Sequence, residues 1–144
     1  MTVRRTMGST AAPLLVVLAL AGTACVRHTT RDDVEAAVRH YLSDFTNRDT
    51  TALAADYDSS CHVSAATLRR EFDAFGDQPL RIDVSGVDVQ MESATTANAV
   101  AHGALTVGTR SFPLTGTSGT GQFHLIVEGG RWRIANCPGT VAPG

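Results

Sequence analysis

The side chains best suited to acid–base chemistry in this 144-residue chain are its five histidines. A histidine acts as a general base when a neighbouring group orients its ring, and Asp44, Asp56 and Tyr57 are the candidate orienting groups. No spacing in the sequence fixes which of these residues would meet. We therefore predict no catalytic residue, no cofactor and no metal site. The histidines are His28, His40, His62, His102 and His124.

The first two dozen residues have the order of an export signal. Arg4 and Arg5 precede an apolar run over residues 11–21, and small residues follow it. The run is well short of the ~20 residues that a membrane-spanning helix needs. The general secretory route is expected, because the residues after the paired arginines continue a twin-arginine signal poorly.

Cys25 ends the sequence Leu-Ala-Gly-Thr-Ala-Cys. This segment resembles a bacterial lipobox, which implies removal of residues 1–24 as a signal peptide and attachment of fatty acyl groups such as palmitate at Cys25. Gly22 departs from the lipobox pattern, because an aliphatic residue is usual at that position. The alternative is ordinary signal-peptidase cleavage after Ala21 or Ala24, which would release a soluble secreted protein.

Lipidation of Cys25 leaves Cys61 and Cys137, in a compartment that is oxidising enough to join them. A bridge that closes a loop of roughly 77 residues removes about 4 kcal/mol of unfolded-state entropy in the chain-entropy model. A metal site or a reactive thiol is the alternative use of these two cysteines, although no spacing supports either.

The charge pattern excludes one class of partner. All 12 basic residues are arginine, which is typical of a GC-rich bacterial genome. Loss of residues 1–24 leaves ten arginines against 14 acidic residues, a net charge near −4 with no basic stripe. Nucleic acid is therefore not an expected partner.

The chain after a short tether over residues 25–30 begins with the 3.6-residue apolar period of helices. Thr30 starts a capping pair for a helix over residues 31–46. Thr50 is expected to cap a short second helix, and Ser64 a third helix that ends near Gly76.

From Leu80 onwards the apolar period changes to two, which predicts strands. The alternation slips by one residue at Ser85-Gly86, which predicts a β-bulge. The next strand, over residues 97–107, carries small residues on one side that allow close packing. A short edge strand over residues 110–114 is expected, because Pro113 cannot donate to a sheet.

The last strands form a predicted hairpin about Gly129-Gly130, the pair that a two-residue type I′ turn requires. This turn places Val127 opposite Trp132 and Leu125 opposite Ile134. Strict alternation then puts Cys137 on the face opposite Trp132, so the strand must end or twist before it reaches Cys137.

Helices followed by an antiparallel, bulged sheet indicate an α+β fold. The capped first helix, the cysteine after the second helix and the closing Gly-Gly-Arg-Trp-Arg-Ile-Ala-Asn-Cys resemble the NTF2-like (cystatin-like) domains of small secreted actinobacterial lipoproteins and transporter-associated proteins. The resemblance covers residues 31–138 and implies a cone of N-terminal helices on a curved antiparallel sheet of four to five strands. It also implies a bridge between Cys61 and Cys137. Residues 139–144 are expected to be a disordered tail.

Domains of this kind include isomerases, dehydratases and cyclases that use a pocket base, so the lining of a pocket matters here. Aromatic residues are the candidate lining, although core packing is the favoured interpretation, because a domain with so few aromatic residues needs most of them to fill its interior. The candidates are Tyr41, Phe45, Tyr57, Phe72 and Trp132.

Together these observations predict an exported, non-enzymatic binding module that is anchored by lipid to the outer face of the cytoplasmic membrane. Its expected partners are the membrane itself, through the anchor, and a membrane protein or an apolar small molecule. The alternatives are a secreted protein that binds a small apolar ligand, and a pocket enzyme of the isomerase or cyclase type.

Overall fold

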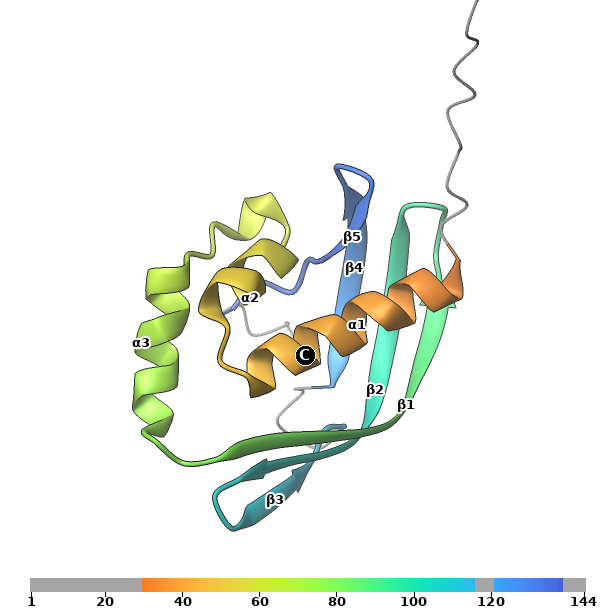
Figure 1. The fold of residues 1–144 in the computed structure, drawn as a ribbon. Coiled ribbons are helices and arrows are strands. Elements are labelled where there is room, and N and C mark those ends of the chain that lie inside the picture. Colours follow the sequence, from red (N-terminus) through yellow and green to blue (C-terminus); the bar gives the residue numbers. More distant parts are fainter. Residues whose placement is uncertain (1–29, 116–120, 139–144) are drawn as a thin grey trace, which may run out of the picture.

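The structure is a computed structural model that describes residues 30–115 and 121–138; the predicted signal peptide, Cys25 and the predicted tail lie outside these ranges. Within them, three α-helices precede five strands (Figure 1). None of the described helices is long and apolar enough to cross a membrane. The elements are α1 (Arg31–Thr46), α2 (Thr50–Asp56), the 3₁₀ turn η1 (Ser59–Cys61), α3 (Ala65–Phe75), β1 (Leu80–Met91), β2 (Thr96–Val107), β3 (Arg110–Pro113), β4 (Gln122–Glu128) and β5 (Arg131–Ile134).

The start of α1 is fixed by the predicted capping pair. The Asp33 amide donates to Thr30 Oγ1 at 3.3 Å, and the Thr30 amide donates to Asp33 Oδ2 at 2.9 Å. These bonds satisfy amides that the first turn leaves unpaired. The apolar period then places Val34, Val38 and Leu42 on one face, each 2 % exposed or less. This face packs on the concave side of the sheet (Figure 1).

The second helix is capped by Asp49 and not by Thr50, so that expectation was wrong. Asp49 Oδ1 accepts a hydrogen bond from the Ala52 amide at 3.0 Å, and Thr50 is the first helical residue. Aspartate is the better N-cap of the two residue types, which accounts for the shift by one position. Ser64 caps α3 as predicted, and α3 ends before Gly76, whose φ is 60°.

The strands form one antiparallel sheet in the order β1-β2-β4-β5, with β3 also paired to β2. The register of β1 against β2 shifts between Val84 and Gly86, which confirms the predicted bulge. Across the bulge, Gly103 has a φ of 143°, and a Cβ placed there would lie 1.9 Å from the carbonyl oxygen of Asp83. The two long strands bend here, and the sheet curls around α1 (Figure 1).

The β4–β5 hairpin has the predicted turn and register. Gly129 and Gly130 have φ values of 57° and 76°, as a type I′ turn requires. Val127 pairs with Trp132, and Leu125 pairs with Ile134. β5 ends at Ile134, three residues before Cys137, so the strand does end before the cysteine as alternation required.

Two hydrophobic cores result. The larger one lies between α1 and the sheet, and the small residues of β2 form part of it. The smaller one joins α2 and α3 to the C-terminal end of α1 and is centred on Leu53, Leu68 and Phe72. The buried residues of the larger core are Val34, Val38, Leu42, Ala97, Ala99, Ala101, Leu114, Phe123, Leu125 and Ile134.

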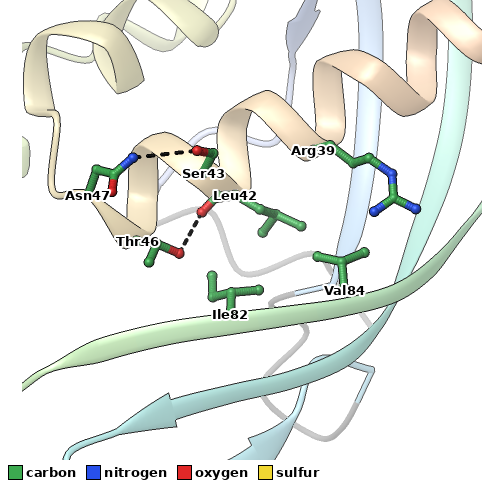
Figure 2. A pocket seen from close by; sticks show the side chains of 7 residues that line it. All are labelled: Arg39, Leu42, Ser43, Thr46, Asn47, Ile82 and Val84. Atoms are coloured by element: carbon green, nitrogen blue, oxygen red, sulfur yellow. Dashed lines mark hydrogen bonds between the residues drawn. The ribbon is translucent and has the colours of Figure 1, made fainter.

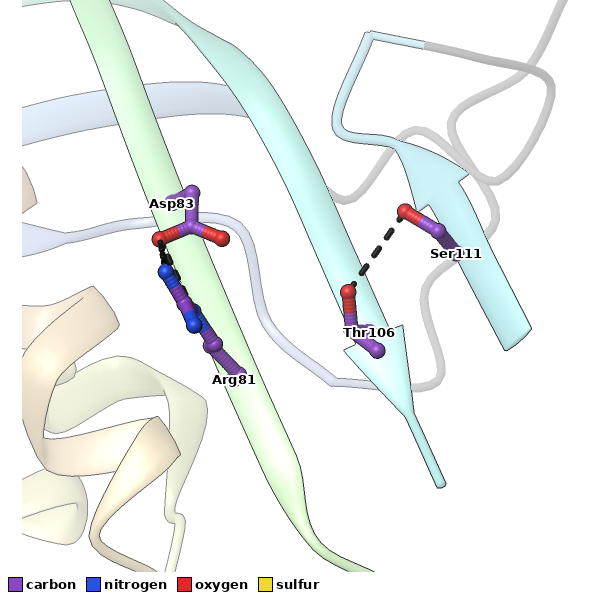
Figure 3. A network of polar contacts seen from close by, with 4 residues as sticks. All are labelled: Arg81, Asp83, Thr106 and Ser111. Atoms are coloured by element: carbon purple, nitrogen blue, oxygen red, sulfur yellow. Dashed lines mark hydrogen bonds and ion pairs between the residues drawn. The ribbon is translucent and has the colours of Figure 1, made fainter. Parts of the chain in front are cut away.

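The opposite face of the sheet is polar along the arm formed by β1, β2 and β3. Arg81, Thr106 and Ser111 lie side by side on three adjacent strands (Figure 3). Arg81 Nη2 lies 2.9 Å from Asp83 Oδ1, and the Thr106 hydroxyl donates to Ser111 Oγ at 3.5 Å. These contacts are exposed and contribute little to stability, but they keep this face wettable.

Candidate functional site

The predicted disulfide is present. Cys61 ends η1, Cys137 follows β5, and their Cα atoms are 5.0 Å apart. Two hydrogen bonds support the same junction, because the Asp58 amide donates to the Ile134 carbonyl at 2.9 Å and the Ser59 hydroxyl donates to the Glu128 carboxylate. The bridge therefore joins the turn between α2 and α3 to the end of the last strand. It is the feature of this molecule that points most directly to an oxidising, extracytoplasmic compartment.

An aromatic pocket lies between the C-terminal half of α1, α2 and α3. Its volume is about 50 Å³. The hydroxyl groups of Tyr41 and Tyr57 are 2.7 Å apart, and their rings meet edge to face with centroids 5.6 Å apart. Four of the five candidate lining residues come together here. The lining is Tyr41, Phe45, Leu53, Tyr57, Leu68, Glu71, Phe72 and Phe75.

Trp132, the fifth candidate, is not in this pocket. It packs against the larger core from β5, and its indole Nε1 is buried without a hydrogen-bond partner among the described residues.

Burial raises the pKa of Tyr41 well above the usual value of tyrosine, and burial also raises the pKa of Tyr57. Both phenols are therefore protonated at neutral pH and offer the pocket hydrogen bonds, not a base.

A wider groove lies beside this pocket, between the end of α3 and the β2–β3 turn. Its volume is about 440 Å³. Phe75 and Phe112 border it and are 40 % and 45 % exposed. Phe75 also lines the aromatic pocket, so one ring serves both concavities. The groove is lined by Phe75, Gln78, Val107, Thr109, Arg110 and Phe112.

A third concavity runs between α1 and β1. Figure 2 shows Ile82 and Val84 of β1 pointing toward Leu42 of α1, with Arg39 along the rim. Its volume is about 340 Å³, and the helix side is polar because Ser43, Thr46 and Asn47 line it. Two of these polar groups are already used: the Thr46 hydroxyl donates to the Leu42 carbonyl at 2.9 Å and Asn47 Nδ2 donates to Ser43 Oγ at 3.5 Å.

Three titratable side chains of the predicted acid–base set meet where α1 packs on α2. His40 Nε2 lies 3.2 Å from Asp44 Oδ2, one helical turn away. Asp56, at the end of α2, completes the group, and the three potential ligand atoms all lie within 4.8 Å of one another. Burial raises the pKa of Asp56 to about 6; His40 opposes this shift, and the negative charge of Asp44 adds to it. When Asp56 is protonated, its carboxyl group can donate a hydrogen bond to Asp44. Two ionised carboxylates cannot form such a bond, because both only accept.

This pKa predicts how stability depends on pH. The folded pKa of Asp56 is raised from 3.8 to about 6, so the folded state holds a proton that the unfolded state has lost. The stabilisation is fully present below pH ~4 and is lost as the pH rises through about 6. Because Asp56 is half exposed, solvent screening limits the effect to about 1 kcal/mol.

Urea unfolding at pH values from 4 to 8, with a chelator present, measures this loss. Asp56→Asn keeps the shape and removes the charge, so its stability is expected to vary less between pH 4 and 6.5 and to exceed that of the parent at pH 7. Parallel pH profiles of the two proteins would contradict the assignment.

The remaining histidines that the structure describes do not meet one another. His102 and His124 share the outer face of the sheet, as predicted, but they contact different partners. His102 Nε2 lies 2.7 Å from Asp88 Oδ2, and His124 Nδ1 lies 2.9 Å from Asn98 Oδ1. His62 is exposed and follows η1, whereas His28 lies outside the described residues. A shallow concavity of about 180 Å³ beside His124 holds amide side chains but no carboxylate.

Sequence reasoning missed the role of Arg48. This residue has a φ of 54° at the corner between α1 and α2. Its guanidinium donates to the carbonyls of Gly76 and Gln78, at 2.6 Å each, and lies 5.9 Å from the centre of the Phe72 ring. Arg48 thus holds the end of α3 against the aromatic pocket. The sequence showed only a polar break between helices.

Comparison of the sequence with protein-family models and with curated proteins finds no match. Comparison of the fold with solved structures does find similar chains. Aln2 from a Streptomyces species has a TM-score of 0.53 at 13 % identity, over 74 % of this chain and 88 % of that one. An NTF2-like protein from Shewanella oneidensis has a TM-score of 0.52 at 14 % identity, over 72 % and 93 %.

A domain with a cystatin-like fold from Nostoc punctiforme has a TM-score of 0.51 at 15 % identity, over 74 % of this chain and 75 % of that one. At sequence identities this low, the similarity shows a shared fold and nothing about function. The order of the elements, the curled sheet and these structural neighbours agree: the chain has the NTF2-like, or cystatin-like, α+β fold.

Proposed function

We propose that this chain is an exported, lipid-anchored binding module that holds an apolar small molecule at the helical end of its fold. The observation that carries the binding role is the pair of exposed rings, Phe75 and Phe112, which border one groove. Exposed apolar surface that gathers in one place on a folded protein commonly marks a binding site. The groove volume of about 440 Å³ is also in the range of small-molecule sites.

The lining indicates the kind of ligand. The groove and the aromatic pocket share Phe75, and their charged or amide lining residues are Arg110 and Gln78 in the groove and Glu71 in the pocket. A ligand with an apolar body and a polar or anionic end suits this pattern, because the rings would cover the body and Arg110 would face the end. The apolar segment of a membrane protein is the other occupant to be tested.

A binding role is preferred to catalysis because of what these concavities lack. None of the four concavities described above combines a histidine with a carboxylate, which an acid–base isomerase or cyclase would require. The tyrosine pair is protonated and therefore supplies no base.

The binding site can be tested with 1-anilinonaphthalene-8-sulfonate, which has an apolar body and an anionic end. We expect Phe75→Ser to weaken its binding about tenfold, because one largely apolar ring leaves the contact. Phe112→Ser is expected to act in the same direction. Ile126→Ser, on the outer face of the sheet, is the matched control and should leave binding unchanged.

Equal affinity in all four proteins would reject the site. Loss of probe binding in Phe75→Ser alone would exclude Phe112 from the site. If membrane extracts yield a specific protein partner whose capture needs both rings while the probe does not bind, the occupant is a protein and the small-molecule proposal fails.

The anchoring part of the proposal is supported by the disulfide, which uses Cys61 and Cys137 and leaves Cys25 as the odd cysteine of an exported chain. We expect the intact mass of the membrane-extracted protein to equal a chain that starts at Cys25 with a diacylglyceryl group and one disulfide. Reduction should then add two hydrogens. An unmodified chain that starts at Gly22 would remove the anchor and favour a secreted binding protein.

A further inference from the structure

Metal-binding side chains from two helices meet on the side of α1 that packs on α2. His40 and Asp44 are one turn apart, which places them on the same helix face. Asp56 reaches them from the end of α2. One nitrogen and two carboxylate oxygens lie within 4.8 Å of one another, and the distance from His40 Nε2 to Asp44 Oδ2 is 3.2 Å.

A second observation indicates that a cation belongs between these side chains. Asp44 is 9 % exposed, and its Oδ2 has no aligned hydrogen-bond donor among the described residues. The Oδ2 atom of Asp56 is also buried without a hydrogen-bond partner among the described residues. When Asp56 is ionised, these buried carboxylate oxygens lack donors, which is costly, and the two neighbouring carboxylates also repel each other. A cation that both oxygens bind would relieve both penalties.

We propose that His40, Asp44 and Asp56 bind a divalent transition-metal ion, with zinc as the best match. Imidazole suits zinc, and zinc also accepts carboxylate, whereas magnesium and calcium prefer oxygen ligands alone. Two ligands of a tetrahedral zinc ion are about 3.4 Å apart, so modest rotation of these side chains closes the site. The inference is independent of the apolar ligand and goes beyond the proposed function.

The exposure of His40 adds a detail about the site. Its side chain is 66 % exposed, whereas that of Asp44 is 12 % exposed. One wall of the site is therefore buried and the other open, so the remaining coordination positions face solvent. Zinc sites with three protein ligands and an open position have this form, whereas closed structural sites use four protein ligands.

One nearby charge acts against the ion. The positive charge of Arg133 acts on Asp56, and the Nε atom of Arg133 is buried without an acceptor among the described residues. Its charge repels a metal ion at the same carboxylate. Replacement of Arg133 by Met is therefore expected to strengthen metal binding, which a merely structural role of the aspartates would not produce.

Isothermal titration of the purified, disulfide-intact protein with Zn²⁺ alone, after treatment with a chelator, tests the proposal. We expect one ion per chain. His40→Gln and Asp56→Asn should each weaken binding about tenfold or more. His102→Gln is the matched control, because His102 also pairs with an aspartate, at 2.7 Å, but on the outer face of the sheet and outside the three-residue group.

Three results would overturn the proposal. The first is no zinc binding at millimolar concentration, and the second is equal zinc affinity in the parent and His40→Gln. The third is a loss of affinity in His102→Gln as large as that in His40→Gln, which would mean adventitious binding to surface histidines. His40 is exposed, so His40→Gln should fold even if Asp56→Asn does not. Co²⁺ provides a second readout: its visible absorption bands should appear with the parent and disappear with His40→Gln.

Discussion

Removal of the Cys61–Cys137 disulfide is expected to lower the free energy of unfolding by about 4 kcal/mol. The bridge joins residues 76 positions apart, and its loss gives the unfolded chain a much larger set of conformations. Small domains are stabilised by only about 5 to 15 kcal/mol, so the variant Cys61→Ala/Cys137→Ala should keep a folded state with little margin. Urea unfolding at 25 °C measures the loss.

The same titration contains an internal check. Without the bridge the unfolded chain exposes more surface, so the dependence of the free energy on urea concentration should become steeper. Cys25→Ala is the control and should unfold like the parent. A loss below about 1 kcal/mol, or a free Cys61 thiol in the parent, would contradict the assigned role of this bridge.

Gly103→Ala is expected to cost about 3 kcal/mol or more, or to prevent folding. Gly103 has a φ of 143°, and its missing Cβ would lie 1.9 Å from the carbonyl oxygen of Asp83. The new methyl group would therefore require both a strained backbone and a displaced strand. Since Asp83 lies beside the bulge, the displacement would flatten the bend that curls the sheet around α1.

Gly86→Ala is a closely matched control, because Gly86 lies at the same bulge on the partner strand. A Cβ at Gly86 would meet no atom within 4 Å, and its φ is not in the left-handed range. We expect its stability to change by about 0.5 kcal/mol or less. Thermal unfolding of the two variants makes the comparison, and equal losses would show that the close approach at Gly103 is not what matters.

Local patterns in the sequence were enough to predict much of the fold. Gly129-Gly130 specified its turn and register because few residue types tolerate two successive positive φ values. The slip of alternation at Ser85-Gly86 located the bulge, since a shift of one residue changes which face is apolar. Residues 30–46 carried both a capping pair and a clear helical period.

The candidate site was harder to predict, because it depends on contacts between distant elements. Asp56 and His40 lie on different helices, 16 positions apart in the sequence, and meet only because α2 packs on α1. Trp132 carries no mark in the sequence that separates a core aromatic from a pocket aromatic. The Asp49 cap was missed because adjacent Asp and Thr residues both suit that position.

The length of α1 has a consequence for the proposed anchor. Thr30, where the tether would join, caps the start of α1, and Phe45 of the aromatic pocket lies near the other end of the helix. Fifteen residues at 1.5 Å each separate these points by about 23 Å. Because α1 is fixed in the larger core, it works as a rigid spacer: however the domain leans over the membrane, the pocket stays that far from the attachment of its tether.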